Sequence, residues 1–122
     1  MNHPEKINVM DKLSLITKPW SHGIVGQVND THIKVAKILG EFVWHSHENE
    51  DELFYVVEGE LFMHFRDKTL TIMPGEFIVI PRGVEHKPQA EVMTSILLIE
   101  PATTVNTGNA PPEERTHEPV WI

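Results

Sequence analysis

Three histidines and one glutamate have the residue types of a metal site. His45 and His47 stand two positions apart, and Glu52 follows five positions after His47. On a β-strand, side chains two residues apart point to the same face at roughly 7 Å, so both imidazoles could reach one ion. With His86 they would form a mixed nitrogen and oxygen shell. Such a shell suits divalent first-row metals and leaves positions open for water or substrate.

The same stretch has a second interpretation, as an acidic loop between two strands. A His-x-His pair alone is weak evidence, and Glu48, Glu50 and Asp51 are typical of a solvated loop rim. Glu50 and Asp51 also compete with Glu52 for the role of carboxylate ligand. The alternation of facing along the following strand favours Glu52.

Three nearby residues are predicted to lie outside the site. Ser46 stands between the two histidines, so alternation sends its hydroxyl to the opposite face and argues against a serine–histidine pair. Trp44 is expected to point toward an outer sheet face or a subunit contact. His64 is expected beside Arg66 on the solvated side of its strand. The sequence identifies no catalytic acid, base or nucleophile.

The wider pattern around these residues resembles the cupin family. The first cupin motif contains a glycine, His-x-His, a glutamate and, six residues further on, a second glycine; the matching residues here are His45, His47, Glu52 and Gly59. The second motif contains a glycine, Pro-x-Gly and a histidine, and the matching residues are Gly75, Pro81, Gly83 and His86. The chain is most similar to small single-domain cupins, some of which are described as mannose phosphate isomerase-like.

Two positions depart from the cupin pattern. Four residues separate Gly40 from His45 where the pattern has five, and Ala90 stands where the second motif closes on asparagine. Neither position is a metal ligand in the pattern, so the departures bear on local turns. The resemblance implies that a divalent transition metal (Mn, Fe, Ni or Zn) is bound by His45, His47, Glu52 and His86. It also implies an antiparallel barrel that forms a homodimer and takes a small-molecule ligand or substrate.

Short strands separated by turn signals are expected from residue 23 onward. Turns recur every seven to ten residues, which is typical of an all-β sandwich or barrel. The predicted strands are 24–28, 31–39, 42–47, 52–57, 60–66, 69–72, 77–80, 84–87 and 94–99. The predicted fold is a small double-stranded β-helix (a jelly roll) over residues 21–101. An N-terminal extension, 1–20, precedes it, with a helix over about 5–16.

The C-terminal segment 102–122 is predicted to be irregular. Its proline-rich, polar composition is typical of a flexible extension. Three large apolar residues close the segment, Val120, Trp121 and Ile122. They favour docking on the barrel or on a partner subunit over partial disorder, because they would otherwise be left in solvent.

Composition narrows the class of protein. The 122 residues carry a net charge of −8, which argues against binding to nucleic acid or to anionic membranes. The absence of cysteine gives no evidence for an oxidising compartment, and we expect a cytoplasmic protein of one domain. The sequence leaves two functions open. One is a metalloenzyme of the isomerase or dioxygenase type that acts on a small polar or carbonyl/sugar-type metabolite, and the other is a non-catalytic cupin that binds or senses a small ligand.

Overall fold

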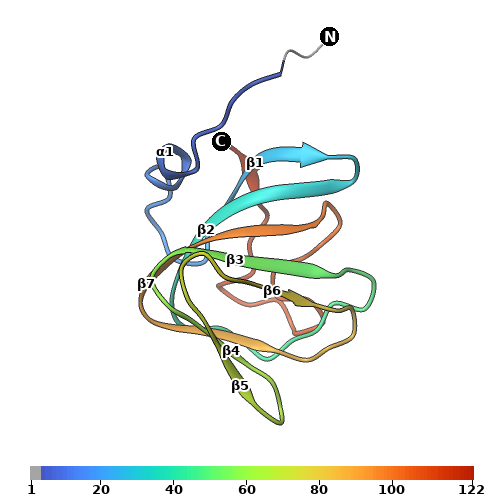
Figure 1. Ribbon diagram of the computed structural model, residues 1–122. Coiled ribbons are helices and arrows are strands. Elements are labelled where there is room, and N and C mark those ends of the chain that lie inside the picture. The colour runs from blue at the N-terminus through green and yellow to red at the C-terminus, as the bar shows by residue number, and fades with distance from the viewer. Residues whose placement is uncertain (1–3) are drawn as a thin grey trace.

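The computed structural model describes residues 4–122 and is built almost entirely of β-strands (Figure 1). One short helix, α1 (Val9–Leu13), precedes the strands. The strands are β1 (His22–Val28), β2 (Thr31–Glu41), β3 (Glu52–Glu58), β4 (Leu61–His64), β5 (Thr69–Ile72), β6 (Phe77–Ile80), β7 (Lys87–Pro101) and β8 (Val120–Trp121). The predicted all-β jelly-roll class with one short helix is confirmed.

Strand β7 organises the sheet because it pairs with three other strands. It runs antiparallel to β2 over most of its length, to β4 near its start and to β3 near its end. β1 extends the sheet beyond β2, while β5 and β6 are attached to β4 and β3. The strands therefore curve around an interior without closing into a complete ring (Figure 1).

The interior is filled by side chains that alternate along the strands. Along β3, the residues at 52, 54, 56 are buried and those between them are only partly so, which is the period of two expected for a half-buried strand. The buried interior cluster comprises Ala36, Ile38, Phe54, Val56, Leu61, Met63, Ile72, Ile80, Ala90, Ile96 and Leu98. A smaller cluster lies on the outer side of β1 and β2 and comprises Leu13, Ile16, Val25 and Val35. Residues of α1 and the segment after it thus cover that outer face.

The predicted helix over 5–16 is longer than the observed one. Asn8 caps the helix at its N-terminus, where its side chain accepts a hydrogen bond from the Asp11 N–H at 2.9 Å. The residues before Asn8 therefore stay outside the helix, and it ends at Leu13 with Ser14 as its C-cap.

Three predicted strands are also wrong in their bounds. Residues 42–47 form no regular strand, because β2 ends at Glu41, just after Gly40, whose φ is +81°. Only an isolated bridge at His45 remains. Of the predicted strand 84–87, only Lys87 lies in a strand, where it begins β7. The predicted strand 94–99 lies inside the longer β7, since β2, β3 and β4 supply partners along its length.

The C-terminal segment docks on the sheet. Val120 and Trp121 pair in parallel with Gly23 and Ile24 of β1. The Ile122 N–H then donates to the Ile24 carbonyl at 3.1 Å. Of the two interpretations of this segment, docking agrees with the structure.

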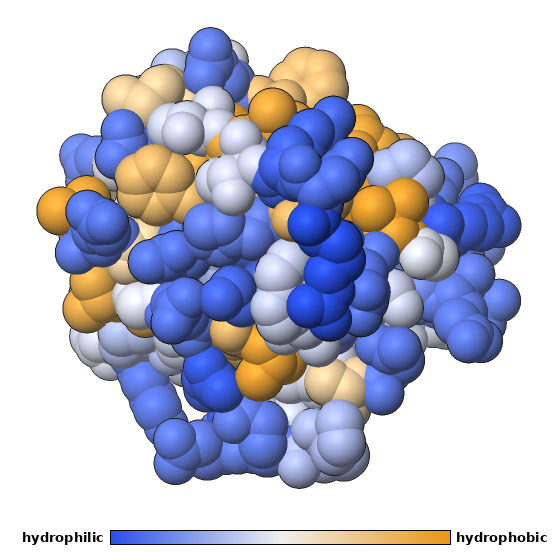
Figure 2. Space-filling view, turned by 90° about the horizontal axis from the view of Figure 1, so that it is seen from below, coloured by the Kyte–Doolittle hydropathy of each residue, from blue (hydrophilic) through white to orange (hydrophobic). Residues whose placement is uncertain are grey.

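The surface outside these contacts mixes polar and apolar residues. Figure 2 shows one face, on which hydrophobic residues lie in separate patches among hydrophilic ones. No helix within residues 4–122 has both the length and the apolar character needed to cross a membrane.

Candidate metal centre

Backbone hydrogen bonds bring the four predicted ligands together. The His45 N–H donates to the His86 carbonyl at 3.0 Å, and the His86 N–H donates to the His45 carbonyl at 2.9 Å. The Gly83 N–H donates to the His47 carbonyl at 2.8 Å, which ties the second histidine to the turn before His86. Glu52 is the first residue of β3. Residues far apart in the sequence are thus held side by side inside the fold.

The four side chains converge on one point in the interior. One nitrogen or oxygen atom from each of them lies within 4.8 Å of all the others. Glu52 Oε1 lies 3.4 Å from His47 Nε2 and 3.3 Å from His86 Nε2. All four residues are at most 4% exposed, so the site is screened from bulk solvent.

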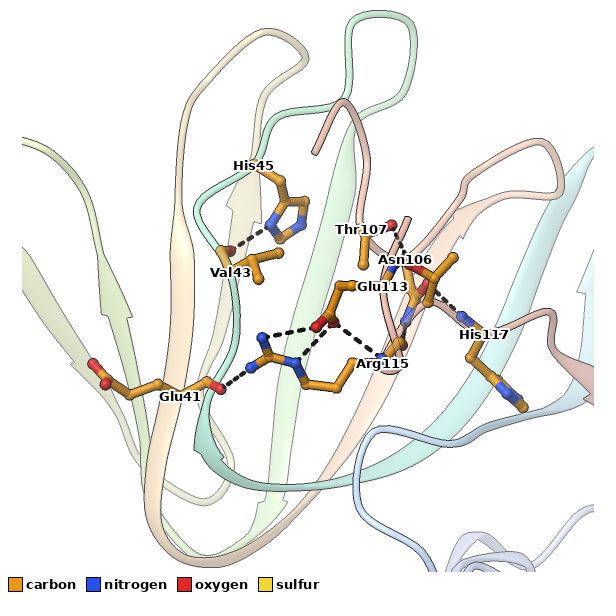
Figure 3. A network of polar contacts seen from close by, with 9 residues as sticks. Glu41, Val43, His45, Asn106, Thr107, Glu113, Arg115 and His117 are labelled. Atoms are coloured by element: carbon orange, nitrogen blue, oxygen red, sulfur yellow. Dashed lines mark hydrogen bonds and ion pairs between the residues drawn. The ribbon is translucent and has the colours of Figure 1, made fainter. Parts of the chain in front are cut away.

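Two backbone carbonyls set the orientation of the imidazoles. His45 Nδ1 lies 2.9 Å from the Val43 carbonyl (Figure 3), and His86 Nδ1 lies 2.9 Å from the Val84 carbonyl. A carbonyl oxygen can only accept, so Nδ1 of both rings must carry a proton. In the neutral ring, the Nε2 atom then carries a lone pair that can bind a metal. Metal-binding histidines in proteins have this arrangement.

Three atoms of the site are buried with no hydrogen-bond partner: His47 Nε2, Glu52 Oε1 and His86 Nε2. Unpaired buried polar atoms are rare in folded proteins because their desolvation is costly. A cation placed among them would satisfy all three at once. The residues therefore fit a divalent metal, with three nitrogen donors and one carboxylate.

The ionisation states also suit metal binding. Burial, and then the neighbouring His86, lower the pKa of His45 to about 4. Burial alone would raise the pKa of Glu52, but the closeness of the His47 and His86 imidazoles outweighs it and lowers that pKa. A neutral imidazole and a charged carboxylate are the forms that coordinate metals.

A small interior cavity of about 20 Å³ adjoins two of the ligands, His45 and Glu52. Its other walls are mainly apolar and come from Trp20, Ile38, Phe42, Phe54, Pro88, Ile96 and Leu98. His22 and Asn106 add two polar side chains. Burial, and then the charge of Lys34, lower the pKa of His22 to about 3, so its imidazole is neutral at ordinary pH. The cavity has room for about one water-sized group directly beside the metal position.

The residues predicted to lie outside the site do so. Glu48 and Asp51 are exposed, and Asp51 Oδ1 accepts a hydrogen bond from the Arg82 N–H at 2.9 Å. The guanidinium of Arg66 lies 3.9 Å from the centre of the Trp44 ring, on the outer side of the sheet. We expected the His64 side chain to be solvated, but its ring is hydrogen-bonded to the side chains of Thr69 and Gln89.

Sequence reasoning missed a buried ion pair beside the metal centre. Lys34 Nζ lies 3.8 Å from Glu100 Oε1, and both side chains are 1% exposed. Both carboxylate oxygens of Glu100 lack a hydrogen-bond partner. Burial, and then the charge of Glu52, raise the pKa of Glu100, while Lys34 acts in the opposite direction. The available signal was a charged residue inside each of two strongly apolar strands, β2 and β7.

The sequence also gave no indication that the C-terminal segment covers the metal loop. The Ser46 N–H donates to Asn109 Oδ1 at 2.8 Å, and the Asn109 N–H donates to the Ser46 carbonyl at 3.0 Å. Gly108 lies so close that a Cβ there would collide with the Ser46 carbonyl oxygen. Figure 3 shows a second tie, in which Arg115 pairs with Glu113 and donates to the Glu41 carbonyl at 2.6 Å.

Comparison with known proteins agrees with this geometry. The model of the cupin domain matches residues 34–99, which is more than half of the chain. The chain belongs to the cupin family. The matched region of this cupin includes all four candidate ligands.

Two solved structures share the fold of this cupin. A cupin-2 domain containing protein from Shewanella frigidimarina NCIMB 400 is 48% identical, with a TM-score of 0.77 over 78% of this cupin and 93% of that chain. Protein NMB1881 from Neisseria meningitidis is 34% identical, with a TM-score of 0.74 over 80% of this cupin and 99% of that chain. The uncharacterized protein YdbB from Bacillus subtilis (strain 168) is 39% identical over 77 residues, or 62% of this cupin and 68% of YdbB.

Proposed function

We propose that this cupin is a metalloenzyme that acts on a small metabolite through a divalent metal held by His45, His47, Glu52 and His86. The observation that carries the proposal is the set of three buried, unpartnered ligand atoms beside an interior cavity. A divalent metal in such a shell supplies Lewis acidity, which polarises a carbonyl or a similar oxygen of the substrate. The expected substrate is therefore a small molecule with an oxygen donor, such as a carbonyl compound.

The protein's own residues position and isolate the reaction. The carbonyls of Val43 and Val84 fix the His45 and His86 rings, so little reorganisation is needed when the site is filled. The apolar cavity walls exclude water and strengthen electrostatic interactions with the substrate. His22 and Asn106 are the polar side chains of those walls that are not candidate ligands. The reaction class expected from the resemblance is isomerisation or dioxygenation.

A second candidate function is non-catalytic binding or sensing of the same class of ligand. One observation favours this binding function. His22 lines the cavity and can titrate but is no candidate metal ligand, and it is a weak base because its pKa is about 3. A general base works best with a pKa near the operating pH. The two functions differ in outcome, because the enzyme releases product and the binder does not.

Metal content tests the proposal directly. The protein is purified without chelator and analysed by inductively coupled plasma mass spectrometry. We expect close to one divalent metal per chain, and its loss in His45→Ala and in His86→Ala. The matched control is His64→Ala, which removes a histidine held by Thr69 and Gln89 and should keep the metal. Wild-type protein that stays metal-free after incubation with Mn, Fe, Ni and Zn salts would contradict the proposal.

Activity separates the enzyme from the binder once the metal is established. The loaded protein is incubated with a panel of carbonyl, sugar phosphate and catechol-type compounds. Product formation that disappears with chelator and in His86→Ala supports the enzyme. Saturable binding without product from any panel member supports the sensing or binding cupin.

We also propose that the protein is a homodimer. Phe77 and Val79 point outward from β6 and are 62% and 47% exposed. β6 pairs with β3 along one edge only among the described strands. Exposed apolar side chains of this size beside an open strand edge are typical of an interaction surface.

A further inference from the structure

The metal centre is closed off from solvent in this structure. All four candidate ligands are at most 4% exposed, and the cavity beside His45 and Glu52 has a volume of about 20 Å³, enough for about one water. A metal ion that arrives with several waters in its hydration shell is larger than this space. Part of the chain must therefore move each time the site is filled or emptied.

The C-terminal segment is better suited to this movement than the strands around the site. Strand β7 is held by ladders of hydrogen bonds to β2, β3 and β4. Residues 103–109, in contrast, form no strand. Thr104, Asn106 and Thr107 are buried but polar, so moving them into water exposes little apolar surface. Segments with few apolar contacts and few hydrogen bonds to other elements open locally at the lowest free energy.

Among the described residues, three hydrogen bonds join residues 103–109 to the metal loop, residues 45–50. The Ser46 N–H donates to Asn109 Oδ1 at 2.8 Å, and the Asn109 N–H donates to the Ser46 carbonyl at 3.0 Å. The Thr103 hydroxyl donates to Glu50 Oε2 at 3.0 Å. Gly108 packs on the same loop, and a methyl group in its place would lie 3.0 Å from Cδ2 of the His45 ring. The segment thus covers a candidate ligand directly and is attached by few bonds.

A surface cleft of about 220 Å³ lies between this segment and the metal loop. Its lining comes from residues 46–50 on one wall and residues 103–109 on the other, and it includes the candidate ligand His47. Two carboxylates, Glu48 and Glu50, belong to the first wall, and the described lining includes no lysine or arginine. A cleft with carboxylates and no opposing cation attracts divalent cations. The cleft therefore reaches a metal ligand at the place where the covering segment is attached.

We propose that residues 103–109 are a lid over the metal centre, and that the metal ion enters and leaves through this cleft when the Ser46–Asn109 contacts open. Glu48 attracts the ion on its way in, and His47 is the first ligand that it meets. The lid stays attached at both ends, since β7 precedes it and the bond from Arg115 to the Glu41 carbonyl follows it. This proposal rests on the metal site proposed above.

The rates of zinc exchange test the lid. Uptake by the metal-free protein is followed by stopped flow against a fluorescent zinc indicator, and release is followed by transfer to excess pyridylazoresorcinol. Because the lid must open for both processes, a change that favours the open state should speed uptake and release by the same factor. The Kd of zinc, which is the ratio of the two rates, should then stay unchanged. A change in the geometry of the ligands would alter the Kd instead.

Variants of the lid contacts should show this signature. Asn109→Ala removes the acceptor of the Ser46 N–H and should speed both uptake and release by about fivefold, the effect of losing one ordinary hydrogen bond. Thr103→Val keeps the shape of an exposed side chain and removes its bond to Glu50, so both rates should rise by about twofold even if Asn109→Ala does not fold. Gln27→Ala is the matched control, because that amide bonds the Asn29 carbonyl in the turn between β1 and β2.

The route through the cleft is tested separately from the lid. Glu48→Gln removes one negative charge from the cleft and should slow zinc uptake by about twofold at low ionic strength, with release unchanged. The difference should disappear in high salt, where the charge is screened. Glu91→Gln is the control for net charge, since Glu91 is exposed on β7 and does not line the cleft.

The possible failures can be distinguished. Unchanged exchange rates in folded Asn109→Ala and in Thr103→Val, or a rise in release without the same rise in uptake, overturn the lid. Equal uptake by Glu48→Gln and Glu91→Gln overturns the route and leaves the lid standing. A wild-type protein that binds no zinc overturns the proposed function itself, and this is measured before any exchange rate.

Discussion

At a pH at which Glu100 is ionised, replacing Lys34 by methionine should destabilise the protein by about 4 kcal/mol, because it then leaves a buried carboxylate without its cation. Lys34 Nζ lies 3.8 Å from Glu100 Oε1, and each side chain is 1% exposed. At that distance two unit charges attract by about 4 kcal/mol at an effective dielectric constant of about 20. Methionine keeps most of the volume and shape of the lysine stem. The main change is therefore the loss of charge rather than the creation of a cavity.

The loss of stability should increase with pH. The pKa of Glu100 is raised, so the native state keeps this proton at pH values where the unfolded chain has released it. The contribution of such a group to stability is complete below its unfolded pKa of about 4.5 and is lost as the pH rises through its folded pKa. Lys34→Met removes the charge that opposes the shift and moves the folded pKa further upward. The variant should lose more stability at about pH 9 than at about pH 6.

Urea unfolding followed by circular dichroism, in EDTA so that metal release does not contribute, measures both effects. With a slope near 2 kcal/mol per molar, the midpoint of Lys34→Met should fall by about 2 M. Lys34→Met combined with Glu100→Leu should recover most of this loss, because an apolar pair needs no compensating charge. Arg82→Met breaks the exposed pair with Asp51 and should leave the midpoint unchanged. A Lys34→Met midpoint close to that of wild type, or a double variant less stable than both single variants, would refute the reasoning.

Three further predictions concern the covering segment, the metal and the dimer. In urea unfolding, Gly108→Ala should lower the free energy of unfolding more than Gly75→Ala does. Both glycines have a positive φ, but only a methyl group at position 108 would meet the Ser46 carbonyl oxygen. Equal losses would show that this segment does not pack against the metal loop. Zinc at about 100 times its Kd should stabilise the wild-type protein by about 2.7 kcal/mol in thermal unfolding. The stability of His86→Ala should stay unchanged. A similar stabilisation of this variant would show that zinc binds elsewhere. Phe77→Asp should shift a dimer to a monomer in sedimentation velocity, and a monomeric wild type at high concentration would contradict the dimer.

The ligand set could be predicted from the sequence because its information is local. His45, His47 and Glu52 lie within one short stretch, and their spacing follows from strand geometry and one loop. His86 could be predicted only from the second cupin motif, because no spacing rule connects it with His45, about forty residues earlier. The structure brings these four side chains together, although residues 42–47 form no regular strand. The four candidate ligands could thus be predicted correctly although the strand predicted over residues 42–47 was wrong.

The buried ion pair and the placement of Trp20 in the cavity wall could not be predicted in the same way. Lys34 and Glu100 meet only because β2 and β7 pair in one particular register, in which His32 lies opposite Glu100 and Lys34 opposite Leu98. A shift of one residue in either strand would have sent that strand's charged side chain to the outer face. Trp20 reaches the cavity through a positive φ, which the dipeptide Pro-Trp does not favour. Such features depend on long-range register and on enforced backbone strain.

Strand β8 has a consequence for the behaviour of the protein in solution. Without Val120 and Trp121, the outer edge of β1 would present a row of unpaired N–H and C=O groups to other chains. An open edge of this kind is a template for intermolecular strand pairing and aggregation. By lying along residues 23 and 24, the C-terminal strand occupies that edge and keeps β1 from recruiting a neighbour. The segment that covers the metal loop therefore also protects the sheet against self-association.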